Sequence, residues 1–309
     1  MWRVDDEFEV LEENRREWEL TGPLPPRRRL FVPVDGLRHV SAIQWFEEPP
    51  RVVLLHGRGQ NAHTFDTVLL ALGQPALAID LPHHGHSDAS PTGPSGVVEH
   101  ARDIAEALDT LLTTPVVLVG MSLGGLVSLL VTRDRPDLIR HLVLVDVTPA
   151  ADPRRARAVI EFLDGPESFA SLEEMVERTI AHHPSRSPQS LRRGVLHNAR
   201  QRPDGRWVWR HQQYPPAPSS PSPRPDLWRI LEEIAVPVTL LRGDRPPSVV
   251  LEEDVVEFIR RRPHDRSITL AGGHSLQGDD PLGVARVLGD VLSASSSLVP
   301  RCKDSHGWT

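Results

Sequence analysis

The sequence predicts an α/β protein with a mostly parallel, doubly wound sheet and an inserted helical cap. Short runs of Val, Leu and Ile alternate with amphipathic helical segments over residues 30–149. Such alternation is typical of a parallel sheet with helices on both faces. It stops over residues 150–234 and resumes over residues 235–292. At 309 residues the chain is long enough for one large domain with an insertion.

The predicted elements follow in order along the two core segments. A hairpin of strands at residues 30–34 and 38–46 turns at Asp35-Gly36. Apolar runs and helical spacing then predict these elements: strands at 51–56, 76–80, 141–147, 236–241 and 266–270, and helices at 62–72, 97–112, 251–261 and 281–292. A buried strand and an apolar helix also lie within residues 115–131, and Pro136 ends this helix.

Three segments lie outside the predicted core. Residues 1–29 are charged and then Pro/Arg-rich, which predicts a loosely attached N-terminal arm with a helix at about residues 5–20. Residues 150–234 are predicted to form the helical cap, with a Pro/Ser-rich loop at residues 214–225. Residues 293–309 are polar and are expected to form a flexible tail.

Composition restricts the possible partners. With 35 Lys and Arg against 42 Asp and Glu the formal charge is −7, and no basic stripe suggests a nucleic acid or an anionic membrane surface. The single cysteine, Cys302, excludes an intramolecular disulfide. The acidic first ten residues do not resemble a secretory signal. We therefore expect a cytoplasmic protein without membrane partners, whose oligomeric state the sequence does not indicate.

The segment Gly120-Met121-Ser122-Leu123-Gly124 is the most informative motif. It joins a buried strand to an apolar helix and matches the G-x-S-x-G nucleophile elbow, in which a sharp turn presents a serine. The glycines allow strand and helix to approach closely. The helix N-terminus stabilises negative charge that develops nearby. Ser122 is therefore the predicted nucleophile.

A serine nucleophile needs a general base, which His274 is predicted to provide. It follows a late strand in Ala271-Gly272-Gly273-His274. The competing histidines in the predicted cap are expected to be surface or pocket-lining residues: His182, His183, His197 and His211. A second group lies close together in sequence but has no carboxylate or cysteine pattern, so we predict no metal site: His83, His84 and His86.

Taken together, four motifs resemble the α/β-hydrolase fold superfamily, specifically its capped members with a serine nucleophile, the esterase- and lactonase-like ones. The motifs are the elbow, His56-Gly57, an Asp-Leu-Pro-x-His-Gly-x-Ser turn at residues 80–87, and Gly273-His274. His83 stands where this turn often has glycine. The resemblance covers about residues 30–292. It implies an oxyanion hole formed by the backbone N–H groups of Leu123 and Arg58, and a cofactor-free mechanism.

The acid that orients His274 has two candidates. In many relatives it lies three residues beyond a glycine that follows the strand read here at residues 236–241. That position is Pro246, which cannot serve, so Asp244 is the nearest carboxylate. Other relatives take the acid from the end of the strand after the elbow helix, which is Asp146 here. We favour Asp146 because a carboxylate ending a buried strand needs a partner, and Asp244 remains the alternative.

The predicted function is hydrolysis of a small-molecule carboxylic ester or lactone through a Ser-His-Asp triad and an acyl-enzyme. The same triad also serves C–C hydrolases, thioesterases and peroxidases. Two other classes remain: a non-catalytic ligand-binding module, and an NAD-dependent oxidoreductase, because residues 57–62 match G-x-G-x-x-A. Cap aromatics such as Phe162, Trp207 and Trp209 are candidates for lining an apolar substrate pocket.

Overall fold

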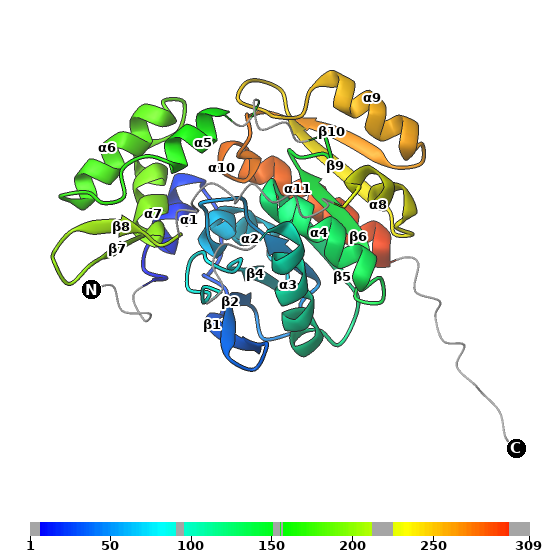
Figure 1. Cartoon of the computed structure of the whole chain (residues 1–309), viewed down its shortest axis with the longest axis horizontal. Coiled ribbons are helices and arrows are strands. Elements are labelled where there is room, and N and C mark those ends of the chain that lie inside the picture. The colour runs from blue at the N-terminus through cyan, green and yellow to red at the C-terminus, as the bar shows by residue number, and fades with distance from the viewer. Residues whose placement is uncertain (1–6, 91–95, 151–154, 156, 212–224, 297–309) are drawn as a thin grey trace, which may run out of the picture.

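An eight-stranded sheet forms the centre of the computed structural model, which describes residues 7–90, 96–150, 155, 157–211 and 225–296 (Figure 1). The strand order is β1-β2-β4-β3-β5-β6-β9-β10. Strand β2 is antiparallel to both of its neighbours, and the other pairs are parallel. The strands are β1 (Arg27–Val34), β2 (Arg38–Trp45), β3 (Val52–Leu55), β4 (Ala76–Ile79), β5 (Val116–Met121), β6 (Ile139–Val145), β9 (Val238–Gly243) and β10 (Arg266–Leu270). The predicted fold class is confirmed.

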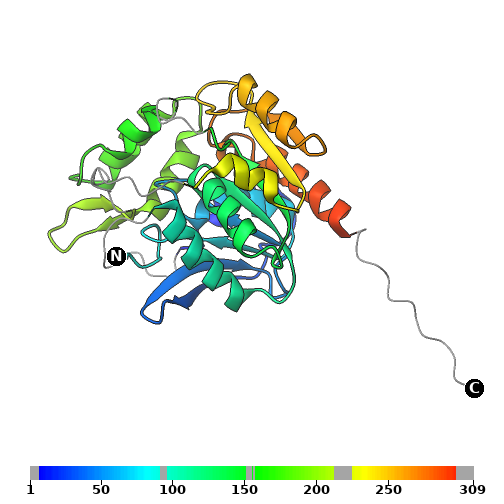
Figure 2. The same ribbon diagram turned by 45° about the vertical axis from the view of Figure 1, so that its right-hand side comes forward.

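Helices cover both faces of the sheet (Figures 1 and 2). One apolar layer packs on α3 (Val97–Leu111), α4 (Leu123–Asp134), α8 (Leu227–Glu233) and α9 (Glu252–Arg261). The other packs on α1 (Leu11–Glu17), α2 (Asp66–Leu72), α10 (Leu276–Asp279) and α11 (Pro281–Ser296). Strands β3, β4 and β5 are buried at every position, which explains why they read as continuous apolar runs.

The described part of the inserted segment is not entirely helical. It contains α5 (Arg157–Leu163), α6 (Leu172–His182), α7 (Pro188–Asn198) and a short hairpin of β7 (Ala199–Gln201) and β8 (Trp207–Trp209). Phe169, Met175 and Trp209 belong to a separate apolar cluster within it. Helix α8, at the end of the predicted cap, instead joins the core layer that contains α4. The predicted Pro/Ser-rich loop at 214–225 lies almost entirely outside the described residues.

The N-terminal arm is packed against the core, so the expectation of a loose attachment is wrong. Leu11 of α1 is fully buried, and the Glu7 carboxylate pairs with Arg29 of β1. Glu17 accepts hydrogen bonds from Ser187 and Arg193 of the cap. The arm supplies the carboxylates that two buried arginines require, and composition alone does not reveal such pairing. At the other end, α11 extends to Ser296, and the rest of the predicted tail lies outside the described residues.

Asp80, at the end of β4, contacts three segments that are distant from one another in sequence. Its fully buried carboxylate accepts hydrogen bonds from the N–H groups of Ala62 and His86 and pairs with Arg29 at 2.8 Å. Burial opposes ionisation, but Arg29, His56 and the two amides lower the pKa of Asp80 to about 2.

Within the described residues, every helix is too short or too polar to cross a bilayer.

We expect Asp80→Asn to destabilise the protein by about 3–5 kcal/mol at pH 7, because it leaves a buried arginine with one partner fewer. Urea unfolding measures this difference. The exposed Asp137→Asn, which removes a carboxylate beside Arg135, is the matched control and should change stability little.

The loss in Asp80→Asn should also depend on pH. The pKa of Asp80 is about 2 in the folded chain, against about 3.9 for an unfolded aspartate. The ionic stabilisation is therefore complete above about pH 4 and disappears as the pH falls towards 2. The difference between wild type and variant should shrink over that interval, and a constant difference would contradict the assigned ion pair.

Candidate active site

Ser122 occupies a strained turn between β5 and α4. Its backbone has φ 50° and ψ −116°, a conformation rarely adopted by residues other than glycine. The Ser122 N–H donates to the carbonyl of Val145 on the adjacent strand at 3.2 Å. This bond ties the turn to the end of β6.

The glycines of the elbow are required by close packing. A Cβ added to Gly124 would lie 2.3 Å from the carbonyl oxygen of Leu55 in β3. A Cβ added to Gly120 would lie 2.4 Å from the carbonyl oxygen of Gly124. Backbone atoms cannot yield at such distances, so helix α4 approaches β3 and β5 only because both residues are glycine.

His274 lies on the loop between β10 and α10 and reaches Ser122. Its Nε2 is 3.1 Å from Ser122 Oγ, and its Nδ1 is 2.8 Å from Asp146 Oδ2. The loop turns through Gly272, whose φ of 151° favours glycine. The structure therefore brings together the predicted nucleophile, base and preferred acid in one hydrogen-bonded chain.

Asp146 is fully buried at the end of β6 and is held by several donors. Its Oδ1 accepts from the Gly243 N–H at 3.1 Å and from Ser248 Oγ at 2.5 Å. Its Oδ2 accepts from the Val249 N–H at 3.0 Å as well as facing His274. Sequence reasoning missed Ser248, because no motif marks this loop serine.

Asp244 occupies a different position from the one a triad acid needs. Its side chain is about half exposed, and its Oδ1 accepts from the Gly272 N–H at 2.9 Å. It therefore braces the loop that carries His274, while the imidazole itself faces Asp146.

The loop after β3 passes directly beside the nucleophile. A Cβ on Gly57 would lie 3.3 Å from the Cβ of Ser122. His56 holds this loop to β4, because Nδ1 lies 2.7 Å from the Gly57 carbonyl and Nε2 accepts from the Leu81 N–H at 2.9 Å. The Arg58 guanidinium pairs with Asp164 of the cap at 3.3 Å, so the side chain links core and cap.

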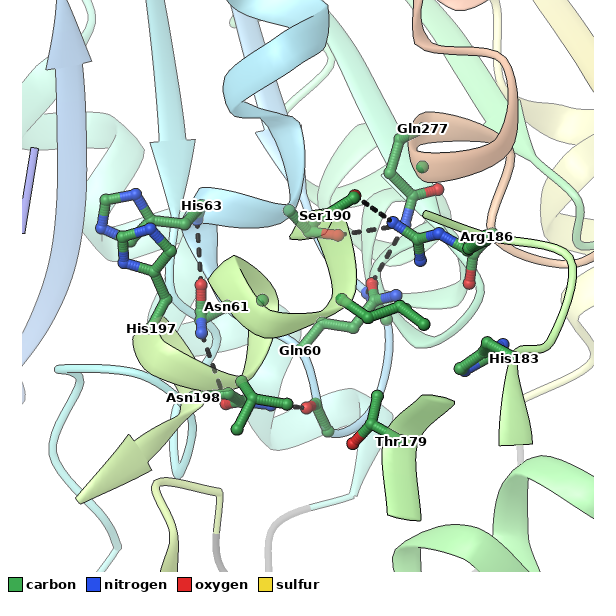
Figure 3. A pocket seen from close by; sticks show the side chains of 18 of the residues that line it. Gln60, Asn61, His63, Thr179, His183, Arg186, Ser190, His197, Asn198 and Gln277 are labelled. Atoms are coloured by element: carbon green, nitrogen blue, oxygen red, sulfur yellow. Dashed lines mark hydrogen bonds between the residues drawn. The ribbon is translucent and has the colours of Figure 1, made fainter. Parts of the chain in front are cut away.

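Ser122 and His274 line a pocket between core and cap. Figure 3 shows other side chains of this pocket. The core contributes the loop after β3, the elbow after β5 and the His274 loop after β10. All three follow the carboxyl ends of parallel strands. The cap contributes apolar and polar side chains. Its apolar lining residues are Val159, Phe162, Leu163, Leu191, Val195 and Trp209. Ligands of open α/β sheets bind at this edge.

The polar part of the pocket combines an arginine with uncharged imidazoles. Burial, with help from His182 and Arg186, lowers the pKa of His183 to about 4. Arg186 donates to Ser190 Oγ at 3.3 Å, and Gln277 donates to Gln60 Oε1 at 3.3 Å (Figure 3). Arg186 is therefore one of the groups that carry positive charge in this pocket at neutral pH.

A group of titratable side chains lies at the other end of the pocket, where His63 and His197 stack with ring centroids 3.7 Å apart (Figure 3). His63 Nδ1 is 2.8 Å from Asp66 Oδ2, and Nε2 is 3.1 Å from Glu7 Oε2. Burial opposes protonation, but these carboxylates raise the pKa of His63 to about 9. Among the described residues, His63, Asp66 and His197 are close enough to hold a metal ion.

The sequence prediction of no metal site rested on other histidines and did not consider this group. In the structure, His83 accepts from the Ser90 N–H at 3.2 Å, and His84 Nδ1 lies 2.9 Å from the Pro82 carbonyl. Those side chains are engaged locally. In the group that forms in the fold, His63 of η2 (Ala62–Phe65) and Asp66 of α2 are close in sequence, and His197 of α7 joins them from the cap.

Comparison with known proteins identifies relatives along most of the chain. The model of the Alpha/beta hydrolase family matches residues 52–287. Esterase Rv0045c of Mycobacterium tuberculosis is 39% identical over 295 residues, covering 93% of this chain and 96% of the relative. The pimeloyl-[acyl-carrier protein] methyl ester esterase of Neisseria meningitidis is 30% identical over 221 residues, which cover 69% of this chain and 80% of that relative.

A solved structure of the M. tuberculosis esterase, from work on its inhibition by transition metals, superposes with a TM-score of 0.81 at 38% identity. It covers 93% of this chain and 99% of that chain. The chain described here therefore belongs to the alpha/beta hydrolase family. This membership decides against the dinucleotide-binding alternative, which rested on the G-x-G-x-x-A match at residues 57–62. Gly59 of that match packs against Leu163 of the cap.

Proposed function

We propose that this alpha/beta hydrolase cleaves carboxylic esters or lactones through Ser122, His274 and Asp146. The supporting observation is the continuous chain from Ser122 Oγ through the His274 imidazole to Asp146, with separations of 3.1 and 2.8 Å. The esterase names of the relatives support the same substrate class.

In this mechanism Ser122 Oγ attacks the carbonyl carbon as His274 Nε2 removes the hydroxyl proton. The imidazolium then gives this proton to the leaving alkoxide, and an acyl-enzyme remains. Water attacks the acyl-enzyme by the same route and releases the acid. The Asp146 carboxylate holds Nδ1–H and stabilises the imidazolium, while its other donors prevent it from turning away.

The tetrahedral intermediate carries an oxyanion that needs donors. We assign this role to the backbone N–H groups of Leu123 and Arg58. Leu123 is the first residue of α4, so its N–H has no partner within the helix. Arg58 follows Gly57, which packs against Met121 and Ser122 of the elbow. In this proposal the two backbone dipoles act beside the nucleophile, where they stabilise developing charge.

The cap wall supports an acyl or ring group with apolar surface. Trp209 contacts the rings of Phe162 and Phe169, and both Trp209 and Phe162 line the pocket. Closing such a wall over the elbow would also exclude water while the acyl-enzyme persists. We therefore expect graded selectivity for the size of the apolar group, since each methylene contributes only about 1–3 kcal/mol.

Ser122→Ala should reduce ester hydrolysis on the order of 10³-fold or more, because attack and proton transfer act as one unit. Turnover of p-nitrophenyl esters by purified variant and wild type measures this loss. A fluorophosphonate probe should label the wild type at Ser122 and leave the variant unlabelled. Comparable turnover by both proteins would overturn the serine-hydrolase mechanism, and an unreactive wild type would favour a non-catalytic binding module.

The two candidate acids should separate clearly in kinetics. Asp146→Asn should lower kcat on the order of 10²–10⁴-fold, because the amide no longer selects the Nδ1–H tautomer of His274. Asp244→Asn is the matched control and should retain most activity, because its carboxylate holds a loop backbone. Urea unfolding of both variants checks that the folds are intact. The reverse ranking of kcat would assign the acid to Asp244.

Trp209→Ala should alter selectivity between short and bulky acyl esters by about tenfold or more in kcat/KM, because it removes a pocket wall. Trp207→Ala is the control. Trp207 lies on the same strand and its backbone pairs with Phe169, but it is not among the described residues that line the pocket. Fluorophosphonate labelling of Ser122 should persist in both. A single common factor for all esters would show that Trp209 has only a structural role.

A further inference from the structure

We propose that His63, Asp66 and His197 form a binding site for a divalent transition metal ion of the Zn²⁺ type, in the pocket wall between core and cap. Each residue offers one ligand atom, and these atoms all lie within 4.8 Å of one another. The three side chains are buried, with at most 9% of each residue exposed. The His63 and His197 rings stack nearly parallel, so a ring must rotate before both nitrogens point at one ion. The usual Zn–N and Zn–O distances are about 2.0–2.2 Å.

The donor types match this class of ion. Two imidazole nitrogens and one carboxylate oxygen are ligands that Zn²⁺ and its neighbours prefer, and three protein ligands leave a coordination position open. Asp66 provides an independent indication. Its Oδ1 is buried and has no hydrogen-bond partner among the described residues, although its Oδ2 faces His63. A buried carboxylate oxygen without a donor is costly, and a cation would satisfy it.

The surroundings of His63 resemble the support that metal-binding histidines usually have. Its Nε2 lies 3.1 Å from Glu7 Oε2, and Glu7 is held in turn by Arg29 Nε at 2.9 Å. A carboxylate on the far nitrogen orients the ring and strengthens it as a ligand. The metal would replace the proton between His63 Nδ1 and Asp66 Oδ2, and this proton would pass to solvent.

Binding there would join the cap to the core. His197 belongs to α7 of the cap, and Asp66 begins α2 of the core. Their neighbours already meet, since Asn61 donates to Asn198 at 3.3 Å and Asn198 donates to the Gly59 carbonyl. The metal would therefore strengthen an existing contact on the wall of the pocket that contains Ser122, at the end opposite Arg186 (Figure 3).

Isothermal titration of the chelator-treated full chain with Zn²⁺ tests the site. We expect one Zn²⁺ per chain at this site, and Asp66→Asn or His197→Gln should weaken its affinity by about 100-fold or more. Two controls change histidines of the same pocket: His182→Gln, outside the cluster, and His274→Gln, at the triad. Both should retain Zn²⁺ affinity. Unchanged affinity in the first pair, or loss in either control, would overturn the assignment.

A second measurement covers the case in which a ligand variant folds poorly. Glu7→Gln keeps all three ligands and should weaken Zn²⁺ binding by about tenfold, because it replaces the carboxylate that orients His63. The same carboxylate pairs with Arg29, so urea unfolding of this variant accompanies the titration. Zn²⁺ should raise the Tm of the wild type and of His182→Gln, and raise that of Asp66→Asn much less. Equal Tm shifts in all these proteins would exclude the site. These readouts need no ester turnover, so they stand apart from the test of the proposed hydrolysis.

Discussion

The arrangement of the candidate site depends on the hydrogen bonds that the buried carboxylate of Asp146 accepts. It collects donors from the end of β9, from the loop containing Ser248 and Val249, and from the His274 ring. These segments approach each other only in the folded chain. Because a fully buried carboxylate is stable only when its oxygens are satisfied, the same contact both supports the fold at this edge and orients the imidazole.

A second buried carboxylate organises the opposite side of the nucleophile. Asp80 ties the start of η2 and the turn after β4 to Arg29 of β1. His56 adds a bond from the loop after β3 to Leu81. The loop that contains Gly57 and Arg58 is thereby tied to the end of β4, and Gly57 packs against the elbow. Fixed dipoles of this kind need no reorganisation when charge develops on the carbonyl oxygen of a substrate attacked by Ser122, which suits the proposed oxyanion hole.

The inserted segment adds a wall to a pocket that the core alone would leave open on one side. The reactive end of the pocket consists of strand ends and turns, whereas its apolar wall and its His197 come from the cap. The N-terminal arm contributes to both parts, because Glu7 contacts His63 of the core and Glu17 contacts Arg193 of the cap. Core, cap and arm therefore meet around one cavity, although the sequence suggests three separate segments.

Local physics made much of this protein predictable from sequence. The periodic apolar runs indicated the parallel sheet, and the glycines around Ser122 indicated the elbow, because few other residues tolerate such close packing. The Gly-Gly-His segment similarly placed His274 near it. Contacts between distant segments were not readable in this way. Four features depend on which loops lie adjacent in space. They are the pairing of His274 with Asp146 in place of Asp244, the hydrogen bond from Ser248, the packed arm, and the stacking of His63 on His197. Tertiary structure decided them, since burial and hydrogen bonding act between residues that the sequence separates.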